Sequence, residues 1–470
     1  MATLTPSTRP DGLESELRKS LGEGSVIDDP EVLAARADDW SGWPSGTPRL
    51  LVTPSDTGGV ARCLSICNAH RVAVVVQGGR TGLAGGAAAR TGEVMLALDK
   101  LAGVEDIDTI GGTMTVRAGT TLEAAQAAAR GRGMELEIDL GARGSCQIGG
   151  VIATNAGGIR VIGTGMTRAH VLGLEVVLAD GTVLDDMNTM IKNNSGFDLK
   201  QLFIGSEGTL GVVTRAVLRL SPERPGVVTA LAALATTGDA TTALATARSA
   251  LGSSLSAFEA MWSDYVTFMS ERGGYSRPFD AVPPLSVIIE ARGRDESVER
   301  SKLEALLADG LEAGWLTDAT IAASTDQARR IWAMRDEGPA EYGRLFQAIV
   351  PFDVSIPIRS MIGTADRIVG DIRAGWPEAV PLTYGHIGDA NLHLVVGFTA
   401  PIPDDAKLAI STLVYEAVGA VGGAVSAEHG IGQLKKPWLP LSRTPAAIEL
   451  MRCMKSTFDP ANILNPGRVI

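Results

Sequence analysis

The sequence is poor in cysteine and in aromatic residues, and it contains no long apolar run. Its four cysteines, Cys63, Cys67, Cys146 and Cys453, form no zinc-ribbon or disulfide pattern, which fits a reducing compartment. No segment has the apolar core of a signal peptide or the ~20 apolar residues of a membrane span. We therefore expect a bacterial-type cytoplasmic protein without a transmembrane segment, with peripheral attachment to a membrane as the alternative.

Positive charge and histidine are also scarce. The chain has 42 basic and 54 acidic residues, a formal net charge of -12, which argues against nucleic-acid binding because phosphate backbones are repelled. Only five histidines occur in 470 residues, yet three of them lie between His386 and His429. Imidazole is the commonest metal ligand and titrates near pH 7. This concentration therefore predicts a reaction centre, although a single histidine could equally be a hydrogen-bonded core residue.

Glycine, in contrast, is abundant at 55 residues, and three glycine-rich segments lie at residues 74–86, 141–158 and 192–211. The first follows an apolar strand, so its backbone N–H groups could form an anion-binding nest. It has neither the Gly-Lys-Ser/Thr of a Walker A loop nor the Gly-x-Gly-x-x-Gly spacing of a dinucleotide fold. Each segment alone fits a structural turn as well as a ligand loop. Together they predict an extended ligand along the domain.

The first half of the chain reads as alternating strands and helices. Asp56 and Thr121 are positioned to cap helices, and Asp180-Gly181 predicts a hairpin turn in a mixed or antiparallel sheet. Cys63 and Cys67 fall on one face of the first of these helices, where a buried apolar stripe is favoured over a metal pair.

Pro222 and Pro225 mark a domain boundary, after which the composition changes. Beyond it, the predicted strands are 227–234, 285–291, 317–322, 380–384 and 392–398. The predicted helices are 240–251, 298–308, 327–335 and 406–421. We expect two tightly docked domains.

Several sequence segments resemble those of a known family. They are Gln77-Gly-Gly, Val176-Val-Leu-Ala-Asp-Gly181, Lys200-Gln-Leu-Phe-Ile-Gly-Ser-Glu207-Gly, and the C-terminal segment Asp459 to Gly467. They resemble the vanillyl-alcohol-oxidase/p-cresol-methylhydroxylase (PCMH) superfamily, most closely its FAD-linked D-2-hydroxyacid dehydrogenases. That branch includes D-2-hydroxyglutarate dehydrogenases, D-lactate dehydrogenases and the glycolate oxidase D subunit.

The resemblance covers nearly the whole chain and implies an α+β fold of two domains. Residues 1–221 would form a PCMH-type FAD-binding domain. Residues 222–470 would form a substrate (cap) domain of ferredoxin-like βαβ type that carries the metal site. The tail, from about 457 to 470, would return to the FAD domain.

The resemblance also implies which residues hold FAD. Those expected at the pyrophosphate are Gly78, Gly79, Arg80, Thr81, Gly82 and Leu83. Those expected along the rest of the cofactor are Ser145, Gly149, Gly150, Asn155, Glu207 and Asn465. Members with covalent flavin often carry His in the pyrophosphate loop, where this chain has Arg80, so non-covalent binding is expected.

For the reaction centre, the resemblance implies metal ligation by His386, His393 and Glu428, with His429 as the proton-abstracting base. On one helix, the two ligand histidines would lie about 10 Å apart along the axis, so a strand-turn-strand passage has to bring them together. Glu428 and His429 can share a site only in irregular backbone, because neighbours in a strand face opposite sides. Zinc is the first choice of metal, with manganese, cobalt and iron as alternatives.

The implied activity is oxidation of a D-2-hydroxy acid to the 2-oxo acid, with hydride transfer to FAD. Arg335 matches a carboxylate-clamping Arg and Asn391 a substrate contact, although Arg335 could also be a surface helix residue. A Thr and a Lys of the hydroxyglutarate group are replaced by Pro339 and Pro351, so D-lactate and glycolate stay open beside D-2-hydroxyglutarate.

The implied electron acceptor is an electron-transfer flavoprotein or a quinone, and a homodimer is one open assembly. A flavin-binding electron-transfer or scaffold subunit is the non-enzymatic alternative.

Overall fold

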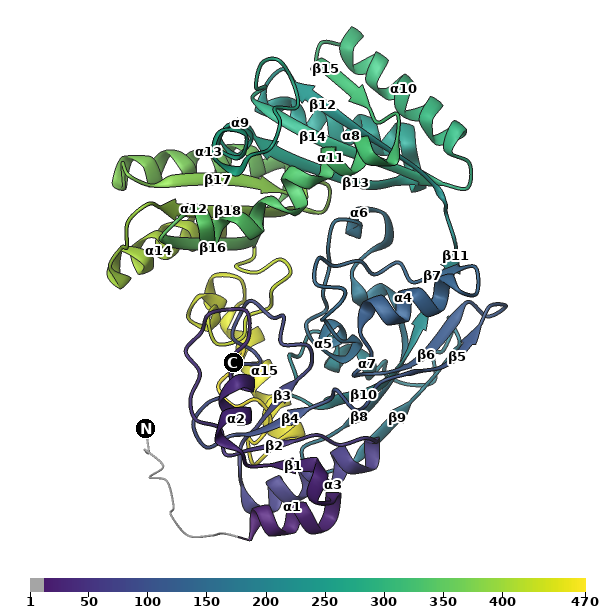
Figure 1. Cartoon of the computed structure of the whole chain (residues 1–470), viewed down its shortest axis with the longest axis vertical. Coiled ribbons are helices and arrows are strands. Elements are labelled where there is room, and N and C mark those ends of the chain that lie inside the picture. The colour runs from purple at the N-terminus through teal and green to yellow at the C-terminus, as the bar shows by residue number, and fades with distance from the viewer. Residues whose placement is uncertain (1–11) are drawn as a thin grey trace. The chain divides into compact units, whose positions relative to one another are not determined.

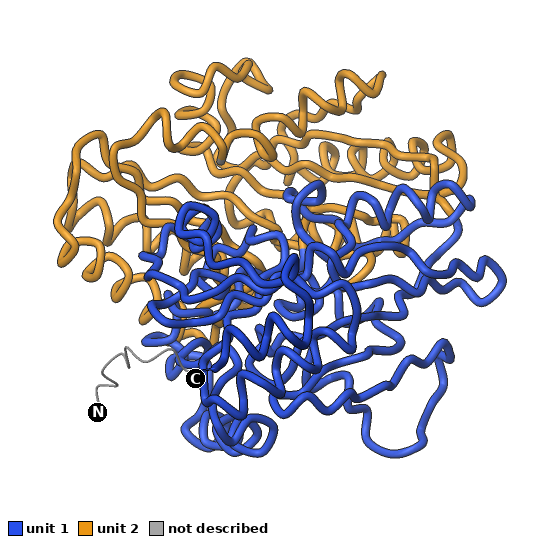
Figure 2. Tube along the Cα trace, turned by 60° about the horizontal axis from the view of Figure 1, so that its bottom comes forward, with its two compact units in different colours: residues 1–157, 166–222, 428–470 blue, residues 158–165, 223–427 orange. Residues whose placement is uncertain are grey.

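The computed structural model of the chain describes residues 12–470 (Figure 1), which divide into two compact units (Figure 2). Unit 1 comprises the chain up to Gly157, Met166–Pro222 and Glu428–Ile470. Unit 2 comprises Gly158–Gly165 and Glu223–Ala427. The change at Pro222 lies beside the expected boundary, whereas the chain re-enters unit 1 at Glu428 rather than near residue 457.

Unit 1 contains a mixed sheet and an antiparallel sheet. The mixed sheet has the order β1-β2-β4-β3, with β1 (Val26–Ile27), β2 (Leu50–Val52), β4 (Val94–Ala97) and β3 (Val74–Gln77). Its β2, β4 and β3 run parallel. The antiparallel sheet has the order β5-β6-β10-β8-β9, with β5 (Val104–Asp108), β6 (Thr113–Arg117), β10 (Val212–Arg219), β8 (Val171–Val177) and β9 (Val183–Asp186). β7 (Met134–Glu135) and β11 (Ser221–Pro222) form a short separate pair.

The helices of unit 1 are α1 (Leu13–Leu21), α2 (Pro30–Arg36), α3 (Thr57–His70), α4 (Leu122–Arg130), α5 (Ile148–Ala153), α7 (Lys200–Phe203) and α15 (Pro445–Phe458). The two predicted caps are confirmed: Asp56 accepts the Gly59 N–H, and Thr121 accepts the Ala124 N–H. The predicted hairpin at Asp180-Gly181 is also confirmed, because β8 and β9 pair antiparallel across it. Gly181 there has φ 90°, a conformation that glycine adopts without strain. Cys63 and Cys67 are fully buried in the core of the unit, as predicted.

Unit 2 is built on one antiparallel sheet of seven strands in the order β15-β12-β14-β13-β17-β18-β16. The strands are β12 (Gly226–Leu234), β13 (Leu255–Trp262), β14 (Leu285–Gly293), β15 (Leu316–Ile321), β16 (Ala348–Ser355), β17 (Val380–Gly385) and β18 (Asn391–Phe398). Its helices are α6 (Val161–Thr164), α8 (Ala240–Leu251), α9 (Ser263–Phe268), α10 (Glu296–Glu312), α11 (Thr325–Asp336), α12 (Tyr342–Leu345), α13 (Ile358–Gly375) and α14 (Asp404–Ala420).

The sheet joins two ferredoxin-like repeats. In the first, β12-α8-β13-β14-α10-β15 gives the spatial order β15-β12-β14-β13, as in a complete βαββαβ unit. In the second, β16-α13-β17-β18-α14 gives β17-β18-β16, and the fourth strand is reduced to a bridge between Ser355 and Ala424. The two repeats meet where Ala260 and Met261 pair with Gly385 and Tyr384.

Each repeat covers the sheet with its long helices. Helices α8 and α10 pack against the first repeat, and α13 and α14 against the second. Shorter elements, α6, α9 and α11, contact strands of the first repeat and, for α9, β17. Within residues 12–470, no helix combines the length and the apolar character that crossing a bilayer requires.

Candidate active site

A short turn between two neighbouring strands brings two histidines together. His386 follows β17, a 3-10 turn covers Ile387–Asp389, and Ala390 in a left-handed conformation (φ 73°) leads into β18. His393 lies on β18 opposite Tyr384. The rings of His386 and His393 have their centroids 5.2 Å apart. The strand-turn-strand passage predicted from the sequence is therefore confirmed.

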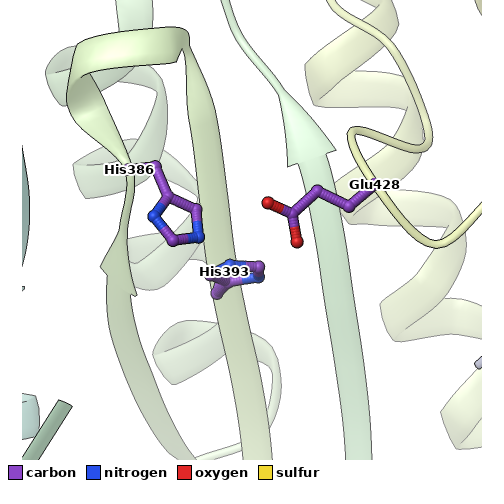
Figure 3. Close-up of side chains that lie close together, drawn as sticks. All are labelled: His386, His393 and Glu428. Atoms are coloured by element: carbon purple, nitrogen blue, oxygen red, sulfur yellow. The ribbon is translucent and has the colours of Figure 1, made fainter. Parts of the chain in front are cut away.

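Glu428 joins this pair. Ligand atoms of His386, His393 and Glu428 all lie within 4.8 Å of one another, and Figure 3 shows the carboxylate pointing toward the two rings. Glu428 directly follows Ala427, whose N–H donates to Asp353 Oδ2 on β16 at 3.2 Å. The donor set, two imidazoles and one carboxylate, fits a divalent metal and leaves coordination positions open.

A second group overlaps the first. Ligand atoms of Asp353, Glu428 and His429 also lie within 4.8 Å of one another. The backbone here is irregular, and Gly430 (φ 80°) follows directly. This is the condition under which neighbouring residues can serve one site, as expected from the sequence.

Glu259 on β13 links a histidine of the first group to Arg335. His386 Nδ1 lies 2.5 Å from Glu259 Oε1, and Arg335 Nε donates to Glu259 Oε2 at 3.0 Å. A carboxylate accepts, so Nδ1 carries the proton and Nε2 has the lone pair. His386 Nε2 lies 3.2 Å from Arg335 Nη2. Burial acts to raise the pKa of Glu259, but its interactions with His386 and Arg335 hold that pKa below its ordinary value.

Arg335 is thus not a surface residue of α11. It is only 6% exposed, and its guanidinium lies 4.7 Å from the ring centroid of Tyr384.

Asn391, at the start of β18, is 3% exposed, and neither its Oδ1 nor its Nδ2 has a hydrogen-bond partner among the described residues. A buried amide without a partner is costly unless a ligand supplies one.

In unit 1, the predicted cofactor residues of the first two glycine-rich segments adjoin. A Cβ added at Gly79 would overlap the Ser145 carbonyl oxygen, and one at Gly78 would lie 3.4 Å from Gln147 Oε1. At Gly82 and Gly150, an added Cβ would meet nothing within 4 Å, so the backbone there is open to a ligand.

The rest of the pyrophosphate loop is partly exposed. Arg80 has φ 57°, and its Nη1 donates to the carbonyls of Ala35 and Asp38. Thr81 is partly buried and Leu83 is 39% exposed.

The third glycine-rich segment joins the same region. Glu207 N–H donates to the Ala153 carbonyl, and the Glu207 carbonyl accepts Asn465 Nδ2 at 2.7 Å. Asn465 Oδ1 accepts the Val76 N–H at the end of β3. Asn155 Oδ1 accepts the Arg168 N–H. The structure therefore brings residues of all three glycine-rich segments together in unit 1, with open space beside Gly82 and Gly150.

Glu259 is a site residue that the sequence did not predict. Its only local signal is a carboxylate within Leu255–Trp262, a strand of fully buried residues. An ionised group in such a strand requires a partner, and here the partners are 76 and 127 positions away. Asp353 carries the same kind of signal, being 1% exposed on β16.

Comparison with known proteins agrees with this architecture. A family model described as FAD binding domain matches residues 48–186, and one described as FAD linked oxidases, C-terminal domain, matches residues 224–469. The solved structure of p-cresol methylhydroxylase superposes with a TM-score of 0.77 at 16% identity, covering 97% of this chain and 96% of that one. The fold is therefore the two-domain α+β fold of the PCMH superfamily, as predicted.

Two curated relatives define the branch. The mitochondrial D-2-hydroxyglutarate dehydrogenase of Bos taurus is 40% identical over 95% of this chain and 81% of its own length. A mitochondrial protein of Schizosaccharomyces pombe, provisionally named a D-lactate dehydrogenase, is 35% identical over 95% of this chain and 88% of its own. The chain belongs to the family of FAD-linked D-2-hydroxyacid dehydrogenases. It is an FAD-dependent enzyme that oxidises a 2-hydroxy acid.

Proposed function

We propose that the chain oxidises a D-2-hydroxy acid with the help of a divalent metal, zinc as the first choice, held by His386, His393 and Glu428. The observation that carries this proposal is the convergence of their ligand atoms within 4.8 Å. Manganese, cobalt and iron accept the same donors and are the alternatives.

The proton-transfer role falls to His429. When bound, the metal would make the substrate hydroxyl more acidic, and FAD would accept the hydride. His429 takes the hydroxyl proton at a ring nitrogen, because a neutral imidazole is a base suited to neutral pH. Its proximity to the Asp353 carboxylate supports this role, since negative charge stabilises the imidazolium that forms.

We further propose that FAD binds without a covalent bond along the residues predicted from the sequence. The pyrophosphate would lie at Gly78–Leu83, and the remainder along Ser145, Gly149, Gly150, Asn155, Glu207 and Asn465. The open space beside Gly82 and Gly150 supports this placement.

D-2-hydroxyglutarate is the first candidate substrate. The relatives that carry this name support it, as does buried Arg335, because a guanidinium can clamp a carboxylate with two parallel hydrogen bonds. Asn391 would supply an amide contact. D-lactate or glycolate is the second candidate. The charge of Arg335 is already shared with Glu259, and Pro351, on the same face of β16 as Asp353, brings no cation.

Anaerobic bleaching of the bound flavin by D- and L-hydroxy acids tests the substrate. We expect D-2-hydroxyglutarate to reduce the flavin fastest. A faster reaction with D-lactate makes the second candidate correct, and a preference for L-acids contradicts the proposal.

Two further measurements test the metal and the base. We expect a chelator to stop flavin reduction and added zinc to restore it, with the visible flavin spectrum retained. The variant His429→Asn should reduce its flavin at least about 100-fold more slowly, the upper range of a general base being about 10⁴-fold. Fast reduction in His429→Asn would exclude the assigned role, and a scaffold subunit would respond to neither change.

We propose a cytoplasmic location and an acceptor such as an electron-transfer flavoprotein or a quinone, with a homodimer as the assembly to be tested. The reduced flavin needs an oxidant other than the substrate, so reoxidation rates with each acceptor decide between them. Light scattering decides the assembly.

A further inference from the structure

The backbone that follows His429 is held by bonds from other segments of unit 1. The N–H groups of Ile431 and Gly432 donate to the two carboxylate oxygens of Glu207, at 2.7 and 2.8 Å. The next two N–H groups both donate to the Ala84 carbonyl, at 2.9 and 3.1 Å. Residues 428–432 belong to no helix or strand, so these bonds determine the path of the loop.

The backbone conformations of Glu207 and of this loop allow a close approach that a larger side chain in the loop would prevent. Glu207 has φ 53°, an unfavourable conformation for a residue with a Cβ that persists only where the surroundings enforce it. Gly430 has φ 80°, and a Cβ there would lie 2.8 Å from Glu207 Oε1. Gly432 has φ 50°, and its Cβ would overlap the Ala84 carbonyl oxygen. A side chain at either glycine would push the loop away from its acceptors.

The backbone of Glu207 is itself held by hydrogen bonds at both its N–H and its carbonyl group. Its N–H donates to the Ala153 carbonyl at 2.8 Å, and its carbonyl accepts Asn465 Nδ2. Asn465 in turn accepts the Val76 N–H with Oδ1 at 2.9 Å. The carboxylate is therefore presented from a rigid base rather than from a mobile loop.

The negative charge of Glu207 is also stabilised by groups of the loop and of the residues that follow it. Burial raises the pKa of its carboxyl, whereas the N–H groups of Ile431 and Gly432 and the positive charge of Lys435 act in the opposite direction. A desolvated carboxylate requires such donors to remain ionised.

We infer that Glu207 is a positioning residue that fixes the backbone directly after His429 and thereby the direction of the His429 ring. This inference rests on the proposed role of His429 as the base. Both carboxylate oxygens of Glu207 are engaged by the loop, so the proposed contact of Glu207 with FAD is a backbone contact, which the substitution of its side chain leaves in place.

Glu207→Gln is the sharpest variant, because it keeps the shape and replaces one acceptor oxygen with an N–H₂ group that faces a backbone N–H. We expect kcat and the anaerobic rate of flavin reduction to fall about 10- to 100-fold, as for a slightly misplaced catalytic group. KM, FAD content and the flavin spectrum should stay unchanged, so that the loss falls on kcat alone. Amide hydrogen exchange at residues 431 and 432 should become faster.

A double-variant comparison separates this inference from the proposed function. If Glu207 acts through His429, the variant Glu207→Gln/His429→Asn should be no slower than His429→Asn alone. Additive losses, unchanged exchange at residues 431 and 432, or an altered FAD affinity would each overturn the inference. Fast reduction in His429→Asn alone would instead overturn the proposed function, and the exchange measurement would still decide whether Glu207 holds the loop.

Two other variants guard against a merely structural effect. Glu93→Gln is the matched control, since Glu93 is a buried carboxylate of the same unit that pairs with Arg468. It should lower Tm without changing the rate per bound flavin. If Glu207→Gln does not fold, Gly430→Ala disturbs the same contact from the loop side and should slow flavin reduction with KM and FAD content unchanged. An unchanged rate in that variant overturns the inference.

Discussion

At the scale of single residues, the reaction centre depends on a carboxylate that contacts neither metal nor substrate in the proposed mechanism. Glu259 accepts from His386 and from Arg335, and its side chain is 1% exposed. A ring N–H held by a carboxylate fixes the tautomer and direction of a metal-binding imidazole. Arg335 and a metal would compete for the His386 Nε2 lone pair, while the Arg335 Nε bond to Glu259 is independent of that competition.

Glu259→Gln tests this role. An amide accepts at only one atom, so one of the two bonds is lost and Arg335 keeps an unpaired buried charge. We expect zinc affinity to fall about 10- to 100-fold, measured by competition with a chromophoric chelator, and Tm to fall as well. Glu290→Gln changes a buried carboxylate on the adjacent strand β14 and should leave zinc affinity unchanged. Equal zinc affinity in Glu259→Gln and the parent protein would contradict the prediction.

At the scale of elements, the turn from Gly385 to Asn391 sets the separation of the two ligand histidines. Gly385 passes close to the next strand, and a Cβ there would lie 2.5 Å from the Asn391 carbonyl oxygen and 3.0 Å from Leu392 Cα. Both atoms belong to the backbone of the next strand, so neither can move aside without shifting that strand. The turn can close only with glycine at this position.

Gly385→Ala should therefore open the turn. We expect a loss of roughly 1–3 kcal/mol in the free energy of unfolding, as for overpacking elsewhere, and a larger loss of zinc binding than of FAD binding. Urea unfolding and metal titration measure the two effects. Gly370→Ala, at an exposed position of α13 where a Cβ meets nothing within 4 Å, should be neutral or stabilising by up to about 1 kcal/mol. Retention of full zinc affinity in Gly385→Ala would show that the turn tolerates the methyl group.

The elements that sequence reasoning found are those with local signals, such as the caps at Asp56 and Thr121 and the hairpin at Gly181. It did not find β13, which is buried on both faces and shows no alternation. It also missed β16, because Pro351 interrupts the strand pattern. That proline is tolerated since β16 is the edge of its sheet.

Several helices were missed as well, among them the long helices α13 and α15. Helix α13 contains Gly363 and Gly370 and ends at Gly375, which lowers its intrinsic propensity, and its packing against β17 and α14 outweighs that loss. In the site, the histidine pair was indicated by the concentration of histidines and by the family resemblance. The contacts of Glu259 and Glu207 could not be predicted, because each joins segments more than 70 residues apart.

At the scale of the whole molecule, the C-terminal segment is an integral part of unit 1. The Val74 N–H donates to the Ile463 carbonyl, and Leu464 bridges to Val74. Arg468 is 1% exposed and pairs with Glu93 through both Nη atoms, at 2.8 and 2.9 Å. A fully buried ion pair leaves a costly single charge when either partner is removed.

Arg468→Ala should therefore destabilise unit 1 by about 3–5 kcal/mol, measured as the free energy of unfolding, and weaken FAD retention. The double variant Glu93→Gln/Arg468→Met removes both charges and should recover most of that loss. If the single and double variants are equally unstable, the packing of Arg468 matters more than its charge.

The return of residues 428–470 also orders the events of biosynthesis. Unit 2 is complete once Ala427 has left the ribosome, whereas the neighbours of β3 and of the Glu93 carboxylate arrive only with the last residues described. The nucleotide-binding half of the enzyme is thus translated first and finished last. Capture of FAD by a finished unit 1 therefore has to wait for residues 428–470, whereas a nascent chain stalled inside unit 2 already has a folding partner for residues 158–165.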